Sequence, residues 1–295
     1  MGEVFLGREA LADGITRHEL RRWYRTIFRG VYIPKSTTPT LYDRAVGAWL
    51  ASNRRGVLSG VVASALHGAK FVDADHPIDI IDHERRRQRG LVIHMDRIAD
   101  DEVTSVSGLP LTTPARTAFD LGRLLARHDA LARLDALMRA RPFQEDDVAK
   151  LLHRYGPARG VRQLRELLPL VDVGAQSPRE SWLRLLLIDA RFPVPETQIP
   201  VLDGGFPIAY LDMGWRQLRL GVEYDGDQHR TDRGQYVKDI RRIRMLEERD
   251  WRIVRVVAED RPTEVIARVR AEFTRRSARR AQMDELAGSS SDFAA

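Results

Sequence analysis

The stretch that decides the fold runs from Tyr210 to His229 and reads YLDMGWRQLRLGVEYDGDQH. In its second half, one parity is apolar: Leu218, Leu220, Val222 and Tyr224. Glu223 and Asp225 have the other parity, so in a β-strand both carboxylates project from the opposite face. Asp212 ends the preceding run, and residues 213–217 are enough for a hairpin turn. The pattern predicts two paired strands that bring Asp212, Glu223 and Asp225 to one edge of a sheet.

Three carboxylates at close range are electrostatically costly, because like charges raise each other's pKa unless a cation joins them. Hard oxygen ligands in this number suit Mg²⁺ or Mn²⁺. Such an ion could activate water and stabilise charge on a phosphate. The alternative is an ordinary hairpin, with Asp225-Gly226 as its turn and Asp227 as a solvated turn residue. The spacing alone leaves both interpretations open.

Positions further along the chain extend the set of Asp212, Glu223 and Asp225. The full set is Asp212, Glu223-x-Asp225-Gly226, His229, Asp239, Arg242, Leu246 and the run from Trp251 to Val256. Together they resemble the PD-(D/E)XK nuclease superfamily, in its very-short-patch-repair (Vsr-like) branch, over residues 175–273. The resemblance implies a Mg²⁺- or Mn²⁺-dependent endonuclease that hydrolyses DNA phosphodiester bonds. It also implies that Asp212 and Glu223 are the main metal ligands, and that Asp225 is a third ligand or positions the water.

The chain departs from the superfamily's commonest pattern at Asp225, where lysine is usual, so the group that assists the attacking water stays open. His229 is the first candidate, because a histidine titrates near the working pH. Lys238, on the following helix, is the second. Asp239 and Arg242 lie three residues apart on that helix. They form either an exposed ion pair or a pair turned toward the carboxylates, with Arg242 holding a phosphate.

A helix begins at Pro178, preceded by Ser177 and with Glu180 three residues after that serine. This is the pattern of a capping box, which fully explains the glutamate. Related nucleases often place a glutamate of this helix near the metal, so Glu180 is also a supporting candidate for the site.

The N-terminal 40 residues predict a small DNA-binding module. A short helix from Leu6 to Ala12 ends before Gly14, and Thr16 with Glu19 forms a second capping box. The helix that follows is expected to carry the DNA-binding arginines Arg17, Arg21, Arg22 and Arg25. Residues 27–34 then predict a β-ribbon, which completes the order of a winged helix-turn-helix. A small helical cap with a solvated arginine face is an equal alternative.

Residues 41–172 predict a mixed α/β region without an evident catalytic pattern. The expected elements are helices at Leu41–Asn53, Val57–Gly68 and from Thr113-Pro114 onward, strands at Ile78–Ile81 and Leu91–Met95, and a basic loop at 84–89. That loop is more typical of a solvated hairpin tip than of a phosphate clamp.

Scattered motifs of the first 125 residues resemble antitoxins of the abortive-infection type IV toxin–antitoxin systems (the AbiE antitoxin family). They are Gly14–Arg17, Arg29–Tyr32, Leu58–Gly60 with Ala65–Gly68, and Thr113–Thr117 with Asp120-Leu121. The resemblance implies a winged helix-turn-helix that binds DNA, and a cognate toxin as a partner. His67 lies in one of these motifs, and a simple helix-end histidine explains it equally well.

Composition bounds these interpretations. The chain has 295 residues and a net charge of +6, and only four of its 48 basic residues are lysines, so its positive surface is arginine-rich and fits a polyanion. It has no cysteine, which excludes disulfides, zinc fingers and thiol catalysis. No run approaches the ~18 apolar residues of a membrane span, and the N-terminus lacks the apolar segment of a secretory signal. We therefore expect a cytoplasmic protein.

The expected fold class is α/β, with a winged helix-turn-helix and mixed region followed by a restriction-endonuclease-like mixed sheet flanked by helices. The expected domains are 1–40, 41–172, 175–273, and 274–295 as a basic helix end with a disordered tail. The leading hypothesis is an endonuclease targeted to DNA by the N-terminal module, and a homodimer would supply the two active sites that duplex cutting usually needs. The alternative is a DNA-binding antitoxin or transcriptional regulator with a catalytically silent nuclease-like domain. Carboxylates that are splayed apart, or a site filled by an arginine, would count against the nuclease.

Overall fold

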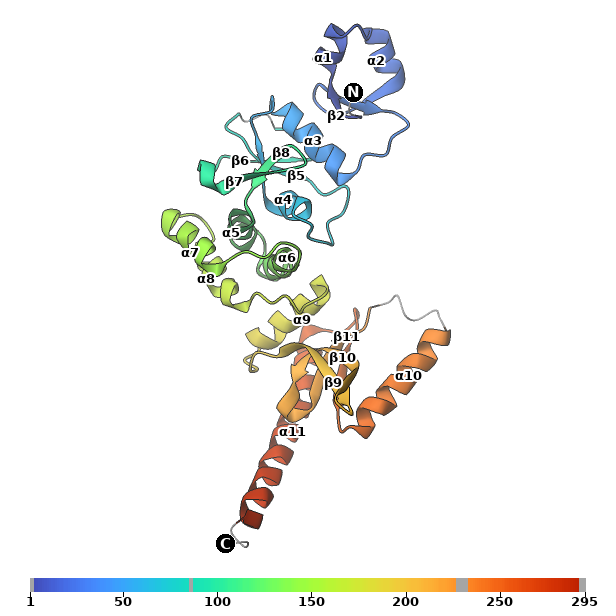
Figure 1. The fold of residues 1–295 in the computed structure, drawn as a ribbon, viewed down its shortest axis with the longest axis vertical. Helices are drawn as coiled ribbons and strands as arrows, with labels where there is room; N and C mark the ends of the chain where they lie inside the picture. Colours follow the sequence, from blue (N-terminus) through green and yellow to red (C-terminus); the bar gives the residue numbers. More distant parts are fainter. Residues whose placement is uncertain (1–2, 85–86, 227–232, 292–295) are drawn as a thin grey trace. The chain divides into compact units, whose positions relative to one another are not determined.

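The computed structural model describes residues 3–84, 87–226 and 233–291 (Figure 1). It divides the chain into two compact units, Met1–Val171 and Asp172–Ala295. The described residues form helices and three β-sheets, which confirms the α/β class. None of the helices in these ranges combines the length and the apolar character that crossing a bilayer requires.

The first unit begins with a helical module on a small sheet. Its elements are β1 (Phe5–Leu6), α1 (Gly7–Ala12), α2 (Arg17–Trp23), β2 (Tyr24–Phe28) and β3 (Val31–Pro34). The strand order is β1-β3-β2. The Thr16 side chain accepts a hydrogen bond from the Glu19 amide at 3.2 Å, and the Glu19 carboxylate accepts one from the Thr16 amide at 2.9 Å. The predicted capping box is therefore present, and the order helix, helix, ribbon agrees with the expectation.

The second helix is shorter than expected, because α2 ends at Trp23 and Arg25 lies in β2. The aromatic and β-branched residues that follow Trp23 favour a strand, and β2 pairs antiparallel with β3 from Tyr24↔Pro34 onward. Arg25 therefore leaves the helical surface on which the sequence placed it.

A five-stranded sheet with the order β6-β5-β4-β8-β7 forms the middle of the unit. Its elements are α3 (Leu41–Ala51), β4 (Val57–Leu58), α4 (Gly60–Leu66), β5 (Ile78–Ile81), β6 (Leu91–His94), η1 (Asp100–Glu102), β7 (Val103–Val106) and β8 (Leu109–Thr112). Helix α3 contacts β4 and β5, and α4 contacts β5 and β8. The predicted helix from Val57 to Gly68 is wrong in its first turn. Val57 and Leu58 pair as a strand, and the chain turns into α4 at Gly60, the first residue of the helix, which has a positive φ of 57°.

Helices complete the unit. They are α5 (Pro114–Leu124), α6 (Arg127–Ala140), α7 (Glu145–Arg154), α8 (Val161–Leu167) and the short η2 (Leu168–Leu170). Thr113 caps α5 and Pro114 lies in its first turn, as the sequence predicts. Helix α5 is central, since it contacts α4, α6, α7 and α8. Gly122 permits this packing, because a Cβ there would overlap the Leu164 side chain.

The second unit is a four-stranded sheet with helices. Its elements are α9 (Pro178–Asp189), β9 (Glu196–Asp203), β10 (Phe206–Trp215), η3 (Arg216–Leu218), β11 (Leu220–Tyr224), α10 (Arg233–Glu248), β12 (Arg252–Val256) and α11 (Pro262–Ser291). The strand order is β12-β11-β10-β9, with only the β11–β12 pair parallel. Helix α10 supplies the crossover that this parallel pair needs.

Two apolar clusters hold this sheet to its helices. One joins Leu183 and Leu187 of α9 to Val222, Val254 and residues of α11. The other joins Leu246 of α10 to neighbours on the strands: Ile199, Val201, Leu211 and Trp251. The expected mixed sheet flanked by helices is therefore present.

The C-terminal segment differs from the disordered tail that the sequence predicts, because α11 continues to Ser291. The residues around Met283 are strong helix formers (Ala, Gln, Met, Glu and Leu), and they carry the helix past the arginines at 275–280.

Candidate functional site

The β10–β11 hairpin brings two of the predicted carboxylates together. Met213 pairs with Val222, so Asp212 and Glu223 are the next residues along the antiparallel register. The Tyr224 amide donates a hydrogen bond to Asp212 Oδ2 at 3.0 Å. Glu223 is buried, with 7% of its surface exposed. The strand pattern read from the sequence thus places these two acids as expected.

Glu180 reaches the same place from α9. Partial burial raises the pKa of Asp212 to about 7, with further contributions from the nearby Glu180 and Glu223 carboxylates. The Tyr224 amide and Arg242 act in the opposite direction without cancelling these effects. Three acids from three elements therefore share one neighbourhood, but the third is Glu180 and not the Asp225 that the sequence pattern predicted.

The Glu180 side chain also has a local structural partner. Ser177 Oγ accepts a hydrogen bond from the Glu180 amide at 3.2 Å, and Glu180 Oε2 accepts one from the Gln176 amide at 2.8 Å. Glu180 thus stabilises the start of α9, one residue earlier than a strict capping box would place its bond, while its charge acts on Asp212.

The carboxylate of Glu223 forms an ion pair with an arginine. Arg242 Nη1 lies 2.9 Å from Glu223 Oε2, and Arg242 Nη2 lies 2.5 Å from Oε1, which is a bidentate pair. Arg242 Nη2 also donates to the Tyr210 carbonyl at 2.9 Å. Of the two interpretations of Arg242, the structure has the side chain turned toward the carboxylates. It binds one of them there, so Glu223 has both oxygens engaged.

Asp225 does not join the pair. It follows the end of β11, its amide donates to the Val256 carbonyl at 2.8 Å, and its carboxylate lies 3.7 Å from Arg255 Nη1. Within the described ranges, no group of three or more His, Cys, Asp or Glu side chains is placed to hold a metal ion. The expected convergence of Asp212, Glu223 and Asp225 is therefore not seen, and the Mg²⁺ or Mn²⁺ site stays a prediction.

The remaining predicted site residues of this unit cannot be placed. His229 lies outside the described residues, and so do the side chains of Lys238 and Asp239, whose backbone belongs to α10. Their assignments as catalytic or supporting groups stay predictions.

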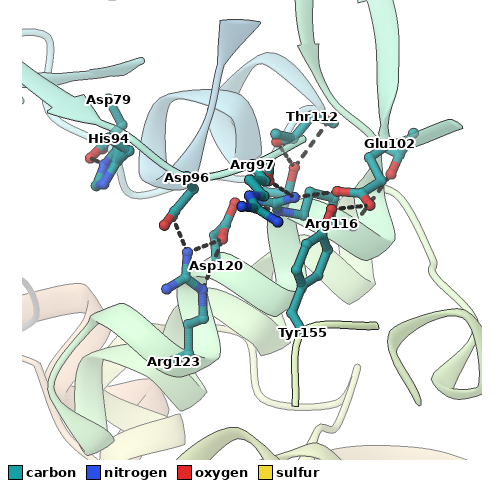
Figure 2. Close-up of polar contacts among 12 residues, drawn as sticks. Asp79, His94, Asp96, Arg97, Glu102, Thr112, Arg116, Asp120, Arg123 and Tyr155 are labelled. Carbon is teal, nitrogen blue, oxygen red and sulfur yellow. Dashed lines mark hydrogen bonds and ion pairs between the residues drawn. The ribbon is translucent and has the colours of Figure 1, made fainter. Parts of the chain in front are cut away.

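The first unit contains a cluster of buried charges that the sequence analysis missed. Arg116 of α5 has 1% of its surface exposed and lies between Glu102 and Asp120 (Figure 2). Its Nε lies 3.0 Å from Asp120 Oδ2, and its Nη1 contacts Glu102 Oε2 and donates to the Arg97 carbonyl at 3.0 Å. We call this cluster the Arg116 network.

Arg123, about two turns after Arg116 along α5, extends the network. Its Nη2 lies 2.9 Å from Asp120 Oδ1, and the same nitrogen contacts Asp96 (Figure 2). Asp120 thus has a guanidinium on each side. The i, i+4 and i, i+3 spacing of Arg116, Asp120 and Arg123 on one helix was the available signal, because these charges share the helix with buried Phe119 and Leu121.

Glu102 closes the other end of the network. Its Oε1 accepts hydrogen bonds from Tyr155 at 2.7 Å and from Arg154 at 2.5 Å, and Arg154 also pairs with Asp101 at 2.8 Å. Every carboxylate here faces at least one guanidinium. Such a closed set of pairs fixes the packing of η1, α5 and α7, and its loss would leave buried charges without compensation.

His67 has an ordinary structural position. It caps the C-terminal end of α4, and its Nε2 lies 2.8 Å from the Thr112 carbonyl. Burial lowers the pKa of His67, against the effect of that hydrogen bond. The helix-end interpretation agrees with this placement.

Helix α2 presents the arginines that the sequence assigned to DNA. Arg17, Arg21 and Arg22 are exposed, and Leu20 is the buried residue that anchors the helix. The Arg22 guanidinium lies 4.9 Å from the centre of the Trp23 ring, and Trp23 is 57% exposed. The fourth arginine differs: Arg25 Nη2 donates to the Thr37 carbonyl at 2.5 Å.

Comparison with known proteins supports one of the two resemblances. Residues 48–170 match the family described as "AbiEi antitoxin C-terminal domain". That segment includes the Arg116 network and the sheet beside it. The match supports the resemblance to antitoxins, and it gives no support to the resemblance to nucleases.

Relatives occur in Mycobacterium tuberculosis. "Uncharacterized protein MT2308" (strain CDC 1551 / Oshkosh) and "Uncharacterized protein Rv2248" (strain ATCC 25618 / H37Rv) are each 32% identical over 243 residues, which cover 82% of this chain and 86% of the relative. The crystal structure of the RV2827C protein from the same species matches at a TM-score of 0.41 and 17% identity, over 68% of this chain and 83% of that one. The chain belongs to the same family as the two mycobacterial proteins of 32% identity, and within it residues 48–170 are similar to the AbiEi antitoxin C-terminal domain.

Proposed function

We propose that the protein is an antitoxin-type regulator that binds DNA through its N-terminal module and a cognate toxin through other surfaces. The observation that carries the proposal is the match of residues 48–170 to an antitoxin domain. The exposed arginines of α2 support its DNA-binding part, because guanidinium groups pair with phosphates and stack on aromatic faces.

The state of the second unit agrees with this proposal. In an active metal site the carboxylate oxygens of Glu223 would face the ion. Here both face Arg242, and Asp225 lies near Arg255. As placed in this structure, the acids do not fit a divalent ion, although oxygen donors are the right chemistry for one. On this proposal the second unit serves as a scaffold.

DNA binding is tested with a fluorescent 30-base-pair duplex of mixed sequence, by anisotropy in EDTA from 50 to 200 mM NaCl. The test variant replaces three arginines of α2: Arg17→Gln, Arg21→Gln and Arg22→Gln. The control variant makes the same charge change on exposed arginines at and before α8: Arg159→Gln, Arg162→Gln and Arg165→Gln. If α2 contacts phosphates, only the first variant loses affinity, by roughly tenfold or more. For this variant, the slope of log affinity against log salt concentration should also become shallower by about one for each lost phosphate contact.

Equal affinity of the wild type and the α2 variant would contradict the assignment of α2. No binding by the wild type at 50 mM NaCl would contradict the DNA-binding function itself. Circular dichroism of both variants confirms that a lost affinity is not a lost fold.

A metal-dependent endonuclease is the second candidate, and one observation favours it. The pKa of Asp212 is raised to about 7 beside Glu180 and Glu223, and a cluster of like charges is where a cation would be stabilising. A cation at Glu223 would first have to displace Arg242. Supercoiled plasmid incubated with Mg²⁺, Mn²⁺ or EDTA tests this candidate, beside an Asp212→Ala/Glu223→Ala double variant. Divalent-dependent nicking that the double variant lacks would establish the nuclease, and intact plasmid in every lane would exclude cutting of this substrate.

A further inference from the structure

Three arginines that are distant in the sequence line one cavity of the first unit. Arg8 comes from α1, Arg29 from the β2–β3 turn and Arg87 from the segment before β6. The cavity has a volume of about 640 Å³. We call it the three-arginine pocket.

Two hydrogen bonds bring the arginine-bearing segments together. The Arg29 amide donates to Gln88 Oε1 at 2.8 Å, which joins the β2–β3 turn to the segment of Arg87. The Gly7 amide donates to the Gly30 carbonyl at 2.9 Å, which joins the same turn to the start of α1. The three arginines therefore line one cavity because these hydrogen bonds hold the segments that carry them next to one another.

The described walls of the pocket carry positive charge from the three arginines. The described lining is completed by uncharged residues: Leu6, Gly30, Leu50, Ala51, Asn53 and Gln88. No aspartate or glutamate is among these described lining residues. Glu9, which follows Arg8, is engaged by Arg54 through two bonds of 2.6 and 2.7 Å. Three arginines thus line one cavity, and Glu9, whose pKa is lowered mainly by its hydrogen bonds with Arg54 and less by the charge of Arg8, is the nearest carboxylate in sequence.

We propose that the three-arginine pocket binds a phosphate group, and that this group is a phosphodiester of the DNA backbone. Guanidinium groups present forked donors that match phosphate oxygens, and three of them suit one group with several acceptors. Leu6 and Leu50 add apolar lining, and Gln88 Oε1, an acceptor in that lining, is already engaged by the Arg29 amide. This part of the inference rests on the proposed DNA-binding function and adds an anchoring site away from the α2 arginines.

The source of the phosphate is decided by two arms of one experiment. The variant carries Arg8→Gln, Arg29→Gln and Arg87→Gln, and the Arg159/Arg162/Arg165 variant is again the charge-matched control. The first arm measures anisotropy with the 30-base-pair duplex in EDTA. The second measures the midpoint of thermal unfolding with inorganic pyrophosphate against NaCl of equal ionic strength.

If the pocket holds a DNA phosphate, the pocket variant loses affinity by roughly ten- to a hundredfold, while the control keeps its affinity. The slope of log affinity against log salt becomes shallower by about one, because the three arginines together neutralise one phosphate. If DNA binding is unchanged but pyrophosphate stabilises the wild type and not the pocket variant, the phosphate chemistry is supported and its source is a free phosphate compound. If the pocket variant matches the wild type in both arms, the proposal is overturned.

Failure of this inference and failure of the proposed function give different results. Loss of DNA binding in the α2 variant alone would retain the function and exclude the pocket as a DNA contact. A wild type that binds no DNA would exclude the DNA-binding function, and the pyrophosphate arm then decides the pocket alone. A second variant, with lysine at the three positions, keeps the charge but loses the forked donors. It should bind between the wild type and the glutamine variant if the fold is intact.

Discussion

Asp120 in the first unit and Asp212 in the second are both withdrawn from solvent, yet their surroundings are opposite. Asp120 lies between the guanidinium groups of Arg116 and Arg123, and burial raises its pKa although both arginines act to lower it. Asp212 lies beside the carboxylates of Glu180 and Glu223, and its pKa rises to about 7. The difference shows that burial alone does not mark a functional acid. What matters is whether a buried carboxylate is surrounded by cations or by other acids. A carboxylate among cations has a structural role, whereas one among acids would be stabilised by binding a positively charged ligand.

The largest expected effect on stability is in the Arg116 network, where each buried acid has a cationic partner. Arg116→Met keeps an unbranched apolar side chain but removes the guanidinium group, so Glu102 and Asp120 each lose one buried partner. We expect a loss of about 3–5 kcal/mol in the free energy of unfolding. Urea denaturation measures it. Arg162→Met is the control, since its side chain is 94% exposed and its pair with Glu166 is worth less than about 1 kcal/mol. A loss below 1 kcal/mol for Arg116→Met would mean that the network is not a structural necessity.

The second prediction concerns Asp212 and has a pH signature. Its folded-state pKa of about 7 exceeds the ordinary 3.8, so between these values the folded state holds a proton that the unfolded state has lost. The contribution of Asp212 to the free energy of unfolding therefore falls as the pH rises from about 4 to about 7, and it is constant above pH 7. Asp212→Asn removes this cost and should be more stable than the wild type at pH 8, by an amount on the order of 3 kcal/mol. The gain should vanish near pH 4.

Asp203→Asn is the matched control for that experiment. Asp203 lies in the same unit and pairs with Arg249 at 2.5 Å, but its side chain is 60% exposed. Its replacement should change stability little, without a gain that grows with pH. A flat difference between Asp212→Asn and the wild type across pH 4–8 would mean that Asp212 is not crowded by other acids.

Arg242→Gln tests the same comparison by removing the cation that lies beside Glu223 and Asp212. The change removes both bonds to Glu223 and the positive charge that lowers the pKa of Asp212. Because Arg242 is partly exposed, we expect a loss of about 1–3 kcal/mol at pH 8. The loss should be smaller at pH 5, where Asp212 is protonated, and the midpoint of the stability profile should lie above that of the wild type. An unchanged midpoint would show that Arg242 and Asp212 are not coupled.

Local patterns of the sequence predicted much of the framework. Thr16 and Ser177 cap helices where expected, and the alternation around Val222 gave the correct strand and the correct hairpin partner. These features depend on residues within a few positions of each other. The end of α2 at Trp23 was missed, because the pairing of β2 with β3 overrides the helical spacing of the arginines.

The site was less predictable, because its state depends on contacts between distant residues. Arg242 meets Glu223 across 19 positions, and Arg154 meets Glu102 across 52. The alternation of residues in the hairpin indicated that Asp212 and Glu223 would lie close together. It could not indicate which cation would pair with them. The three-arginine pocket was hidden for the same reason, since Arg8, Arg29 and Arg87 are ordinary surface residues when each is seen alone.

The smallest expected effect comes from the rim of the Arg116 network. The Arg154 side chain is 42% exposed and pairs with exposed Asp101 as well as with buried Glu102. Arg154→Met leaves Glu102 with Arg116 and Tyr155, so we expect a loss of only about 1 kcal/mol in urea denaturation. A loss as large as that of Arg116→Met would mean that Glu102 needs every one of its cations. The buried acids of the first unit would then be as close to a deficit of positive charge as Asp212, and the contrast between the two units would be one of degree.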